Sequence, residues 1–225
     1  TLLVPLLVAL AVAGLQWRDT LRLLALAVLL IGVGAASLLR RAPAATASGV
    51  RQVPGATLRE ALRSPGFRWL YLVALSSGPI MFIPFAHVSA AARDLGIADA
   101  QAVGLVGMIG IGSLVGRFAI GALADRIGRR QTLVLMQVSM GASYLLWLGA
   151  GGYSMLLMFA LWFGLSYGGI VSLLPALCMD LFGARSVAGI IGSLYSGAAL
   201  GNLCGPFVAG AVFDHAGSYL PVIWG

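Results

Sequence analysis

The sequence contains no lysine, a single glutamate and very few charged residues of any kind. Charged residues make up 9% of its 225 positions, whereas hydrophobic residues make up 60%. Soluble domains carry about 25% charged residues, so this composition excludes an ordinary soluble protein, and it also excludes disordered, collagen-like and coiled-coil chains. A transmembrane β-barrel needs alternating segments of about 10 residues, which do not occur here. The composition therefore predicts an all-α membrane protein.

Cysteine is scarce as well, and acidic residues are outnumbered by arginines. Cys178 and Cys204 both lie within apolar runs, which excludes a disulfide framework. Fourteen arginines against seven acidic residues give a net charge of +7. Such an excess can indicate nucleic-acid binding, but these arginines lie in short gaps between apolar runs and therefore indicate membrane topology. We expect no nucleic-acid partner, no metal and no cofactor.

Charges and turn residues divide the chain into apolar segments that are long enough to span a membrane. The chain opens inside one such segment, without a Met or a basic leader, and stops inside another, so we expect a fragment of a longer protein. The stretch 131–179 is free of charge, too long for one helix, and divided by a glycine-rich turn at 149–152. Complete spans are predicted at 21–39, 69–92, 100–124, twice within 131–179, and at 186–213.

Arginines are distributed unequally between the loops on the two sides of these spans. The loops at 40–68, 125–130 and 180–185 must share one side and contain ten arginines, whereas the opposite loops contain three. The positive-inside rule places the arginine-rich loops in the cytoplasm. We therefore expect a multi-pass protein of the plasma membrane, specifically a bacterial inner membrane, in contact with membrane lipids.

The longest polar segment, 40–68, contains a predicted short helix. Thr57 and Glu60 have the spacing of a capping box, in which each side chain satisfies a backbone N–H of the other residue. Arg59 and Arg63 share one face of this helix, which must end before Pro65. Two interpretations stay open: an amphipathic helix on the inner leaflet with its arginines toward anionic head groups, or a solvated linker.

A glycine and charge motif ends the span at 100–124. It is a helix end with a close-packed glycine, followed by an acid that can pair with a basic cluster across a very short loop. The pattern, G-x-x-x-D-R-x-G-R-R, resembles the loop signature of the major facilitator superfamily of transporters, which lies between helices 2 and 3 and recurs between helices 8 and 9. Its residues here are Gly121, Asp125, Arg126, Gly128, Arg129 and Arg130.

The position of this motif, one hairpin after the long loop, identifies it with the second copy. The resemblance then implies that 1–39 contains helices 5 and 6, 40–68 is the central cytoplasmic loop, and 69–225 contains helices 7–11 and the start of helix 12. The implied fold is a major facilitator-type helical bundle, with the C-terminal half packed against a missing N-terminal half of the same chain. Residues 180–183 and 213–219 resemble the monocarboxylate-transporter and oxalate/formate-exchanger branches.

Arg117 is the only formally charged residue in the interior of a predicted span, since Arg22 is the second residue of the span at 21–39. An Arg at a helix centre costs about 2.5–3.5 kcal/mol on insertion scales, so a functional role is the default expectation. Asp125 follows eight residues later, so Arg117 lies roughly 12 Å from the helix end, close to the middle of a ~30 Å hydrocarbon core. Its partner must be an acid of the missing half, water in a cavity, or the substrate. The planar guanidinium suits a carboxylate.

The family resemblance implies that Arg117 binds the carboxylate of the substrate. Many monocarboxylate transporters carry an Asp four residues earlier that is tied to proton coupling, whereas this chain has Ser113, which does not titrate. The oxalate/formate exchangers add a lysine on helix 11, and its absence here favours a monoanion. Interhelical hydrogen bonding is an equal interpretation for the remaining candidates, which are Tyr71, Tyr195 and Asn202, and more weakly Ser76, Ser77, Trp162, Ser166 and Tyr167.

These features predict a secondary active transporter that moves a small organic anion by alternating access, and not an enzyme. Proton coupling and anion exchange are both open, as are a non-carboxylate substrate, a channel and a substrate-sensing receptor on the same fold. A G-x-S-x-G pattern around Ser166, with His215 downstream, raises the idea of a serine hydrolase. Ser166 lies in mid-span and His215 in an outer loop, too far apart for a nucleophile and its base.

Overall fold

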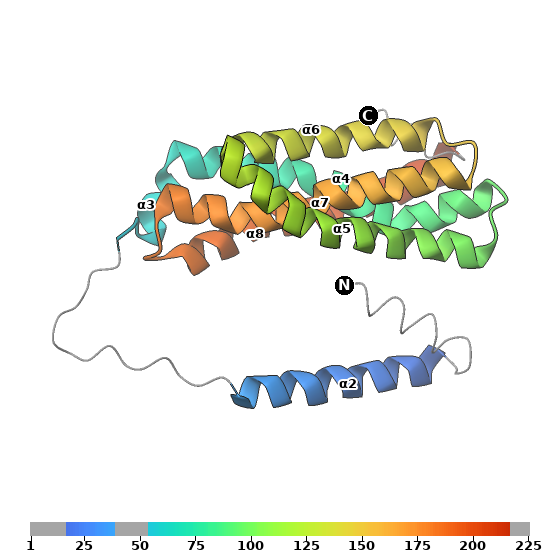
Figure 1. The fold of residues 1–225 in the computed structure, drawn as a ribbon, viewed down its shortest axis with the longest axis horizontal. Helices are drawn as coiled ribbons and strands as arrows, with labels where there is room; N and C mark the ends of the chain where they lie inside the picture. The colour runs from blue at the N-terminus through green and yellow to red at the C-terminus, as the bar shows by residue number, and fades with distance from the viewer. Residues whose placement is uncertain (1–16, 39–53, 217–225) are drawn as a thin grey trace. The chain divides into compact units, whose positions relative to one another are not determined.

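The computed structural model describes residues 17–38 and 54–216 of the chain (Figure 1). The chain divides into two units, Thr1–Gln52 and Val53–Gly225, and each is considered by itself. The described part of the first unit is helix α2, Trp17–Leu38. The described helices of the second unit are α3 (Leu58–Arg63), α4 (Pro65–Asp94), α5 (Asp99–Ile127), α6 (Arg129–Leu148), α7 (Tyr153–Phe182) and α8 (Val187–Ala216).

The all-helical fold class is confirmed, and each complete span predicted from hydropathy is a helix. Among the described helices, α2, α4, α5, α7 and α8 are long and apolar enough to cross a membrane. Helix α6 is more polar, because it begins with two arginines and carries Gln137 and Ser139. Both of these polar side chains are satisfied by other helices: Gln137 Nε2 donates to Ser77 Oγ (2.7 Å), and Ser139 Oγ accepts from Trp162 Nε1 (2.8 Å).

The helices are longer than the apolar segments that predicted them. The expected loop at 125–130 is mostly helix, because α5 continues to Ile127 and α6 begins at Arg129, with Gly128 (φ +91°) as the only break. In the same way, α7 continues through the expected start of the loop at 180–185 and ends at Phe182. Charged residues mark where a segment leaves the apolar core, whereas backbone hydrogen bonding continues into the polar interface.

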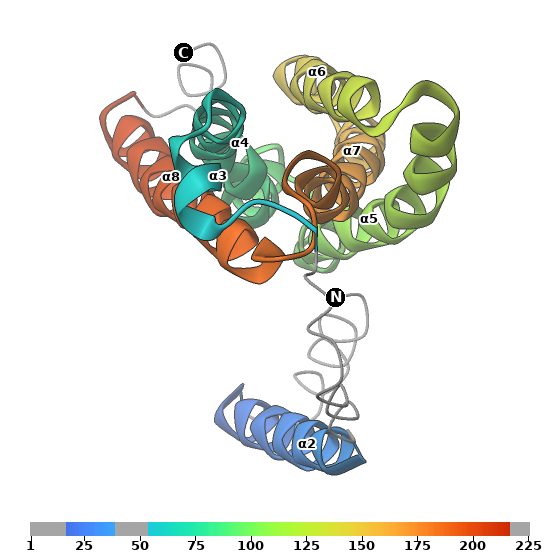
Figure 2. The same cartoon turned by 90° about the vertical axis from the view of Figure 1, so that its left-hand side faces the viewer.

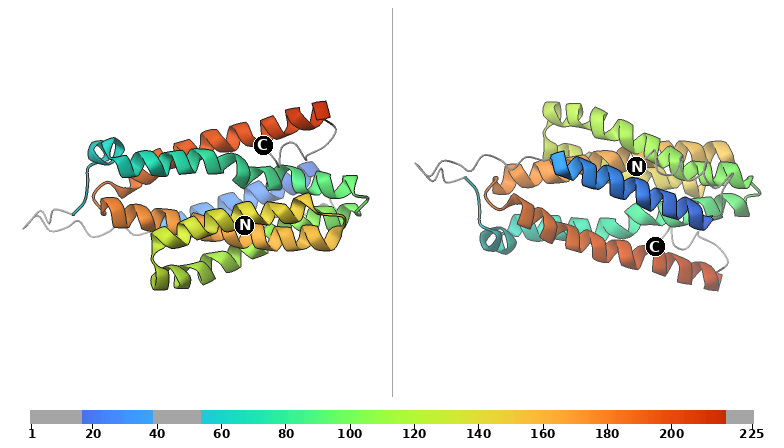
Figure 3. Two further views of the ribbon diagram at one scale, coloured as in Figure 1. Left: turned by 90° about the horizontal axis from the view of Figure 1, so that it is seen from above. Right: turned by 90° about the horizontal axis from the view of Figure 1, so that it is seen from below.

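Two close helix pairs organise the second unit, α4 with α8 and α5 with α7, and α6 packs on α7 (Figures 2 and 3). Small residues set the distance within each pair. A Cβ at Gly116 would meet the Leu165 carbonyl, and one at Gly168 would meet the Ser113 backbone. Gly201 of α8 meets the Leu75 carbonyl of α4 in the same way. The backbones of each pair are therefore in direct contact.

Prolines inside α4 remove backbone hydrogen bonds that other helices replace or cover. Pro84 has no N–H, so the carbonyl of Ile80 loses its partner within the helix. The hydroxyl of Tyr144, on α6, donates to this carbonyl. Inside a membrane an unsatisfied carbonyl would cost several kcal/mol, so this hydrogen bond makes the proline compatible with a spanning helix.

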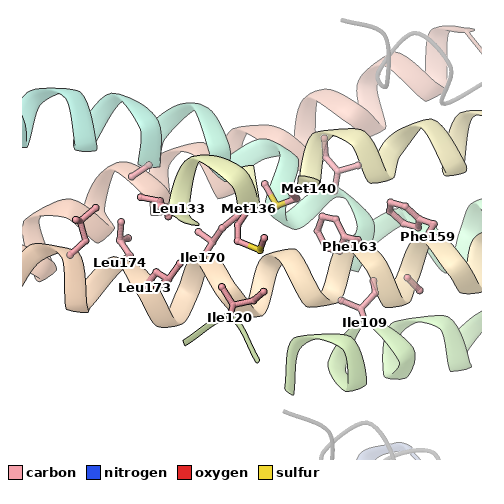
Figure 4. Close-up of a cluster of buried hydrophobic side chains, with 14 of the residues drawn as sticks. Ile109, Ile120, Leu133, Met136, Met140, Phe159, Phe163, Ile170, Leu173 and Leu174 are labelled. Carbon is pink, nitrogen blue, oxygen red and sulfur yellow. The ribbon is translucent and has the colours of Figure 1, made fainter. Parts of the chain in front are cut away.

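The core of the second unit lies where α5, α6 and α7 meet (Figure 4). Aromatic rings from α6 and α7 stack along it: the Trp147 and Phe159 centroids are 4.9 Å apart, and those of Phe159 and Phe163 are 5.5 Å apart. The core continues along these helices in buried aliphatic and sulfur-containing side chains, which include Ile109, Ile120, Leu133, Met136, Met140, Ile170, Leu173 and Leu174.

The short helix predicted in the long loop is present as α3. Its capping box is formed, with Glu60 N 3.3 Å from Thr57 Oγ1 and Thr57 N 2.8 Å from a Glu60 carboxylate oxygen, and the helix ends at Arg63 before Pro65. Ala61 is only 1% exposed because α3 packs on α4 and α8, so this part of the loop is not a solvated linker. The predictions for residues 1–16, 39–53 and 217–225 lie outside the described residues.

Candidate functional site

Arg117 lies on α5, in the half of the helix that leads to the loop motif. The helix is continuous from Asp99 to Ile127, so Arg117 is separated from Asp125 by about 12 Å of helical rise, as predicted. Its side chain is exposed on the surface of the described part of the second unit, and no acidic side chain there pairs with it. The described ion pairs are elsewhere: Arg22 with Asp19, Arg93 with Asp99, and Arg129 with Asp180.

Tyr167 of α7 is the polar residue that the structure brings to Arg117. The guanidinium of Arg117 is near enough to act electrostatically on the phenol of Tyr167. The backbone contact between Gly116 and Leu165 holds α5 and α7 together at this level. Tyr167 is half-buried, and among the described residues its hydroxyl has no hydrogen-bond partner. Arg117 and Tyr167 are therefore two hydrogen-bond donors carried at the same level of neighbouring helices.

Aromatic rings support Tyr167 from two helices. Its ring meets that of Phe85, on α4, edge to face with the centroids 5.4 Å apart. It also lies parallel to the ring of Phe163, with the centroids 6.2 Å apart and an angle of 9° between the planes. The phenol is therefore held in place by ring packing, which leaves its hydroxyl available.

Ser113 lies one turn before Arg117, at the centre of α5, and is 3% exposed. Its Oγ is buried and has no hydrogen-bond partner among the described residues. A buried hydroxyl without a partner costs about 1–3 kcal/mol. A water or a ligand beside Arg117 would remove this cost by forming a hydrogen bond with Ser113 Oγ.

Of the candidates on α8 and α4, Tyr195 and Asn202 have polar groups that no described residue satisfies, whereas Tyr71 packs between the two helices. Tyr195 of α8 is 40% exposed. Asn202 lies against Gly78 of α4, and its Oδ1 is buried without a described partner. Tyr71 instead fills the contact between α4 and α8: its ring covers Gly197, and its hydroxyl lies 3.5 Å from Ser196 Oγ. The structure therefore gives Tyr71 a packing role.

Three of the weaker candidates, Ser77, Trp162 and Ser166, take part in hydrogen bonds between helices. Ser166 is fully buried, and its Oγ lies 2.9 Å from that of Ser139 on α6, so it joins α6 to α7. Ser76 and Ser77 line a cavity of about 750 Å³ between α4 and α6, together with Arg130 and Gln137. No residue of α5 lines this cavity. It is distinct from the Arg117 site.

The loop motif makes one well-defined contact to another helix. Arg129 Nη1 lies 2.6 Å from a carboxylate oxygen of Asp180, at the end of α7, and 3.4 Å from the Ala176 carbonyl. In the described ranges Asp125 forms no ion pair, so the expected pairing of this acid with the basic cluster is not observed. A Cβ at Gly121 would meet no atom within 4 Å, and the close packing expected there is likewise not seen. Arg126, Gly128 and Arg130 complete the motif at the helix ends.

Reversing the charges of the Arg129–Asp180 pair tests whether the two side chains attract each other. It distinguishes this attraction from the effect of losing either side chain alone. The side chains are 38% and 49% exposed, so each single variant, Arg129→Asp or Asp180→Arg, should lower the free energy of unfolding by about 1 kcal/mol or less. The double variant should recover most of that loss. Thermal unfolding of the full-length protein in detergent measures this, and a double variant that unfolds at the sum of the two losses would contradict a direct pair.

Comparison with known proteins places the chain in a family. The profile of the Major Facilitator Superfamily matches residues 80–225, so the chain belongs to this superfamily and is a multi-pass membrane protein. It is 34% identical over 138 residues to the MFS transporter asaE of Aspergillus flavus, covering 61% of this chain and 31% of that protein. The chain spans less than half the length of the curated relatives it matches.

Two further relatives match a larger share of the chain. Monocarboxylate transporter 3 of Rattus norvegicus is 32% identical over 154 residues, which is 66% of this chain and 30% of that protein. The uncharacterized MFS-type transporter YhjX of Escherichia coli is 28% identical over 188 residues, 80% of this chain and 46% of its own length. The resemblance to the monocarboxylate transporter branch, predicted from the motifs, is confirmed.

Proposed function

We propose that the full-length protein is a secondary active transporter that moves a small monocarboxylate across the plasma membrane by alternating access. The observation that carries the proposal is Arg117, a permanent cation near the middle of α5 without an acidic partner among the described residues. Relatives named monocarboxylate transporters support the substrate class. The arginine-rich loops support a cytoplasmic location for the end that carries α3.

Binding would use the two donors that α5 and α7 bring together. The guanidinium fork of Arg117 offers parallel N–H groups to both oxygens of one carboxylate. The Tyr167 hydroxyl would donate a further hydrogen bond, and Ser113 would gain a partner in a bound water. The rings of Phe85 and Tyr167 provide apolar surface for the remainder of a small anion. One cation matches one carboxylate, which favours a monoanion over a dianion such as oxalate.

Coupling to protons would need a titratable group near this site. Each acidic residue that the structure describes lies at or near a helix end, and Ser113 occupies the central position on α5. A proton-binding acid near Arg117 would therefore come from the N-terminal half of the same protein. Exchange of one anion for another needs no such group, so both modes are retained, with proton-coupled uptake as the working proposal.

Flux measurements on the full-length protein in vesicles test this function. We expect saturable uptake of monocarboxylates from a panel of lactate, pyruvate, formate, oxalate and aromatic acids, with oxalate a poor substrate. An inward proton gradient should drive accumulation into vesicles without internal anion. If accumulation does not depend on the proton gradient but occurs when the vesicles are preloaded with unlabelled anion, the protein exchanges one anion for another. Binding without any flux would indicate a receptor and overturn the transport proposal.

A further inference from the structure

The end of the central segment is paired with the turn between α7 and α8. Ala56 N donates to the Phe182 carbonyl at 2.7 Å, and Ala184 N donates to the Pro54 carbonyl at 3.2 Å. Between these hydrogen bonds, Gly55 and Gly183 form an isolated antiparallel bridge. Residues 54–63, which comprise this extended piece and α3, are called the strap below.

Two glycines are required where the strap crosses the turn. Gly55 has φ +143° and Gly183 has φ +74°, a region that side chains rarely adopt. A Cβ at Gly55 would lie 2.7 Å from the Phe182 carbonyl oxygen, and one at Gly183 would lie 2.6 Å from Gly55 Cα. The two backbones therefore touch, and this crossing leaves no room for a side chain on either.

The helical part of the strap adds contacts to two further helices. Ala61 is 1% exposed, and the Leu58 side chain lies 3.5 Å from the Cβ position of Gly189 on α8. Ser64 then caps α4 by accepting from Phe67 N at 3.1 Å, and the Phe67 ring meets the Phe182 ring edge to face at 6.5 Å. Figure 2 shows α3 across the ends of α4 and α8.

Charge also favours the closed strap. The backbone N–H and hydroxyl of Thr57, and then the positive charge of Arg185, hold the pKa of Glu60 below its ordinary value. Thr57 and Glu60 belong to the strap, whereas Arg185 belongs to the turn that it crosses. The carboxylate that caps α3 is therefore within electrostatic range of a cation of the opposing segment, which adds a weak attraction to the backbone contacts.

We propose that the strap fixes the adjacent ends of α4, α7 and α8 to one another and stays closed throughout the transport cycle. A force exerted by the preceding part of the central segment would then act on the helix bundle at Pro54, beside the α7–α8 turn. It would not act at the start of α4. If the strap opened, residues 54–64 would add up to roughly 35 Å of slack between the units. This inference rests on the proposed transport function.

A pair of glycine substitutions isolates the strap contact from backbone strain. Gly183 and Gly96 have nearly the same φ, +74° and +76°, but a Cβ at Gly96 would meet nothing within 4 Å. Gly183→Ala and Gly96→Ala thus introduce the same backbone strain at a positive φ. Only Gly183→Ala also places a Cβ against the strap. We expect Gly183→Ala to lower the maximal uptake rate of the full-length protein by about fivefold relative to Gly96→Ala, with KM unchanged within about twofold.

Cross-linking gives the opposite manipulation. With Cys178 and Cys204 replaced by serine, Leu58→Cys and Gly189→Cys can be joined by a short bifunctional thiol reagent. A closed strap predicts that the cross-linked protein keeps at least about half of its uptake rate. Abolition of uptake by the cross-link, reversed when it is cleaved, would show that the strap has to open and would overturn the proposal.

A readout that does not depend on transport separates this inference from the proposed function. In the background without Cys178 and Cys204, thiol labelling of Ala61→Cys, at a position that is 1% exposed, should be slow and should become faster after Gly183→Ala. If Gly183→Ala does not fold, Arg185→Gln, which leaves both glycines in place, should accelerate labelling in the same direction. Equal labelling rates in the parent and the foldable variants would overturn the closed strap, even if the protein transports monocarboxylates.

Discussion

Replacing Arg117 by Gln should abolish monocarboxylate uptake by the full-length protein while leaving its insertion in the membrane intact. Gln retains a polar side chain but loses the charge and the forked donors, and α5 offers no second cation between Asp99 and Asp125 that could replace them. We expect a loss of at least about 100-fold in kcat/KM, which corresponds to about 2.7 kcal/mol, because two parallel hydrogen bonds to a charged group contribute about 1.5–3 kcal/mol each. Vesicle uptake with surface expression measured in parallel gives this result.

Arg117→Lys separates the contribution of the forked guanidinium N–H groups from that of the positive charge. Lysine keeps the cation as a point charge, so uptake should be badly impaired but measurable. Tyr167→Phe, which removes only the hydroxyl, should reduce uptake less than either substitution of Arg117. Arg93→Gln is the matched control, since Arg93 pairs with Asp99 at the opposite end of α5, and its uptake should stay near the parent level. Normal uptake by both Arg117 variants would assign this arginine a structural role.

Hydropathy and charge were sufficient to predict the helices, because each span must satisfy its own backbone in an apolar environment. They also predicted the position of Arg117 along α5 relative to Asp125, since the distance along one helix depends only on its rise per residue. The capping box at Thr57 and the helix end before Pro65 were equally local. In each case the physical cause lies within a few residues of the feature.

Features that depend on two distant segments were not predictable in this way. Arg117 and Tyr167 lie at the same level because α5 contacts α7. No pattern in the sequence of either helix specifies that contact. The pairing of Arg129 with Asp180, in place of Asp125, has the same origin. The strap was missed because its signal is two glycines, Gly55 and Gly183, that look like ordinary loop residues until their backbones are placed together.

The glycines between α5 and α7 connect this packing to the site, and they carry the last prediction. A Cβ at Gly168 would overlap the Ser113 backbone, and one at Gly116 would overlap that of Leu165. Gly168→Ala should therefore lower the free energy of unfolding by about 1–3 kcal/mol, as overpacking does. Gly104→Ala on α5 has open space around its Cβ, so its gain in helix propensity, up to about 1 kcal/mol, should make it neutral or stabilising.

The two substitutions should also differ in substrate affinity. Moving α7 away from α5 separates the Tyr167 hydroxyl from Arg117, so Gly168→Ala should raise KM at a temperature where the protein is still folded, whereas Gly104→Ala should not. Thermal unfolding in detergent and uptake kinetics at that temperature provide both values. If Gly168→Ala unfolds earlier but binds substrate as the parent does, the helix contact stabilises the fold without positioning the donor pair, and Tyr167 is not a substrate ligand.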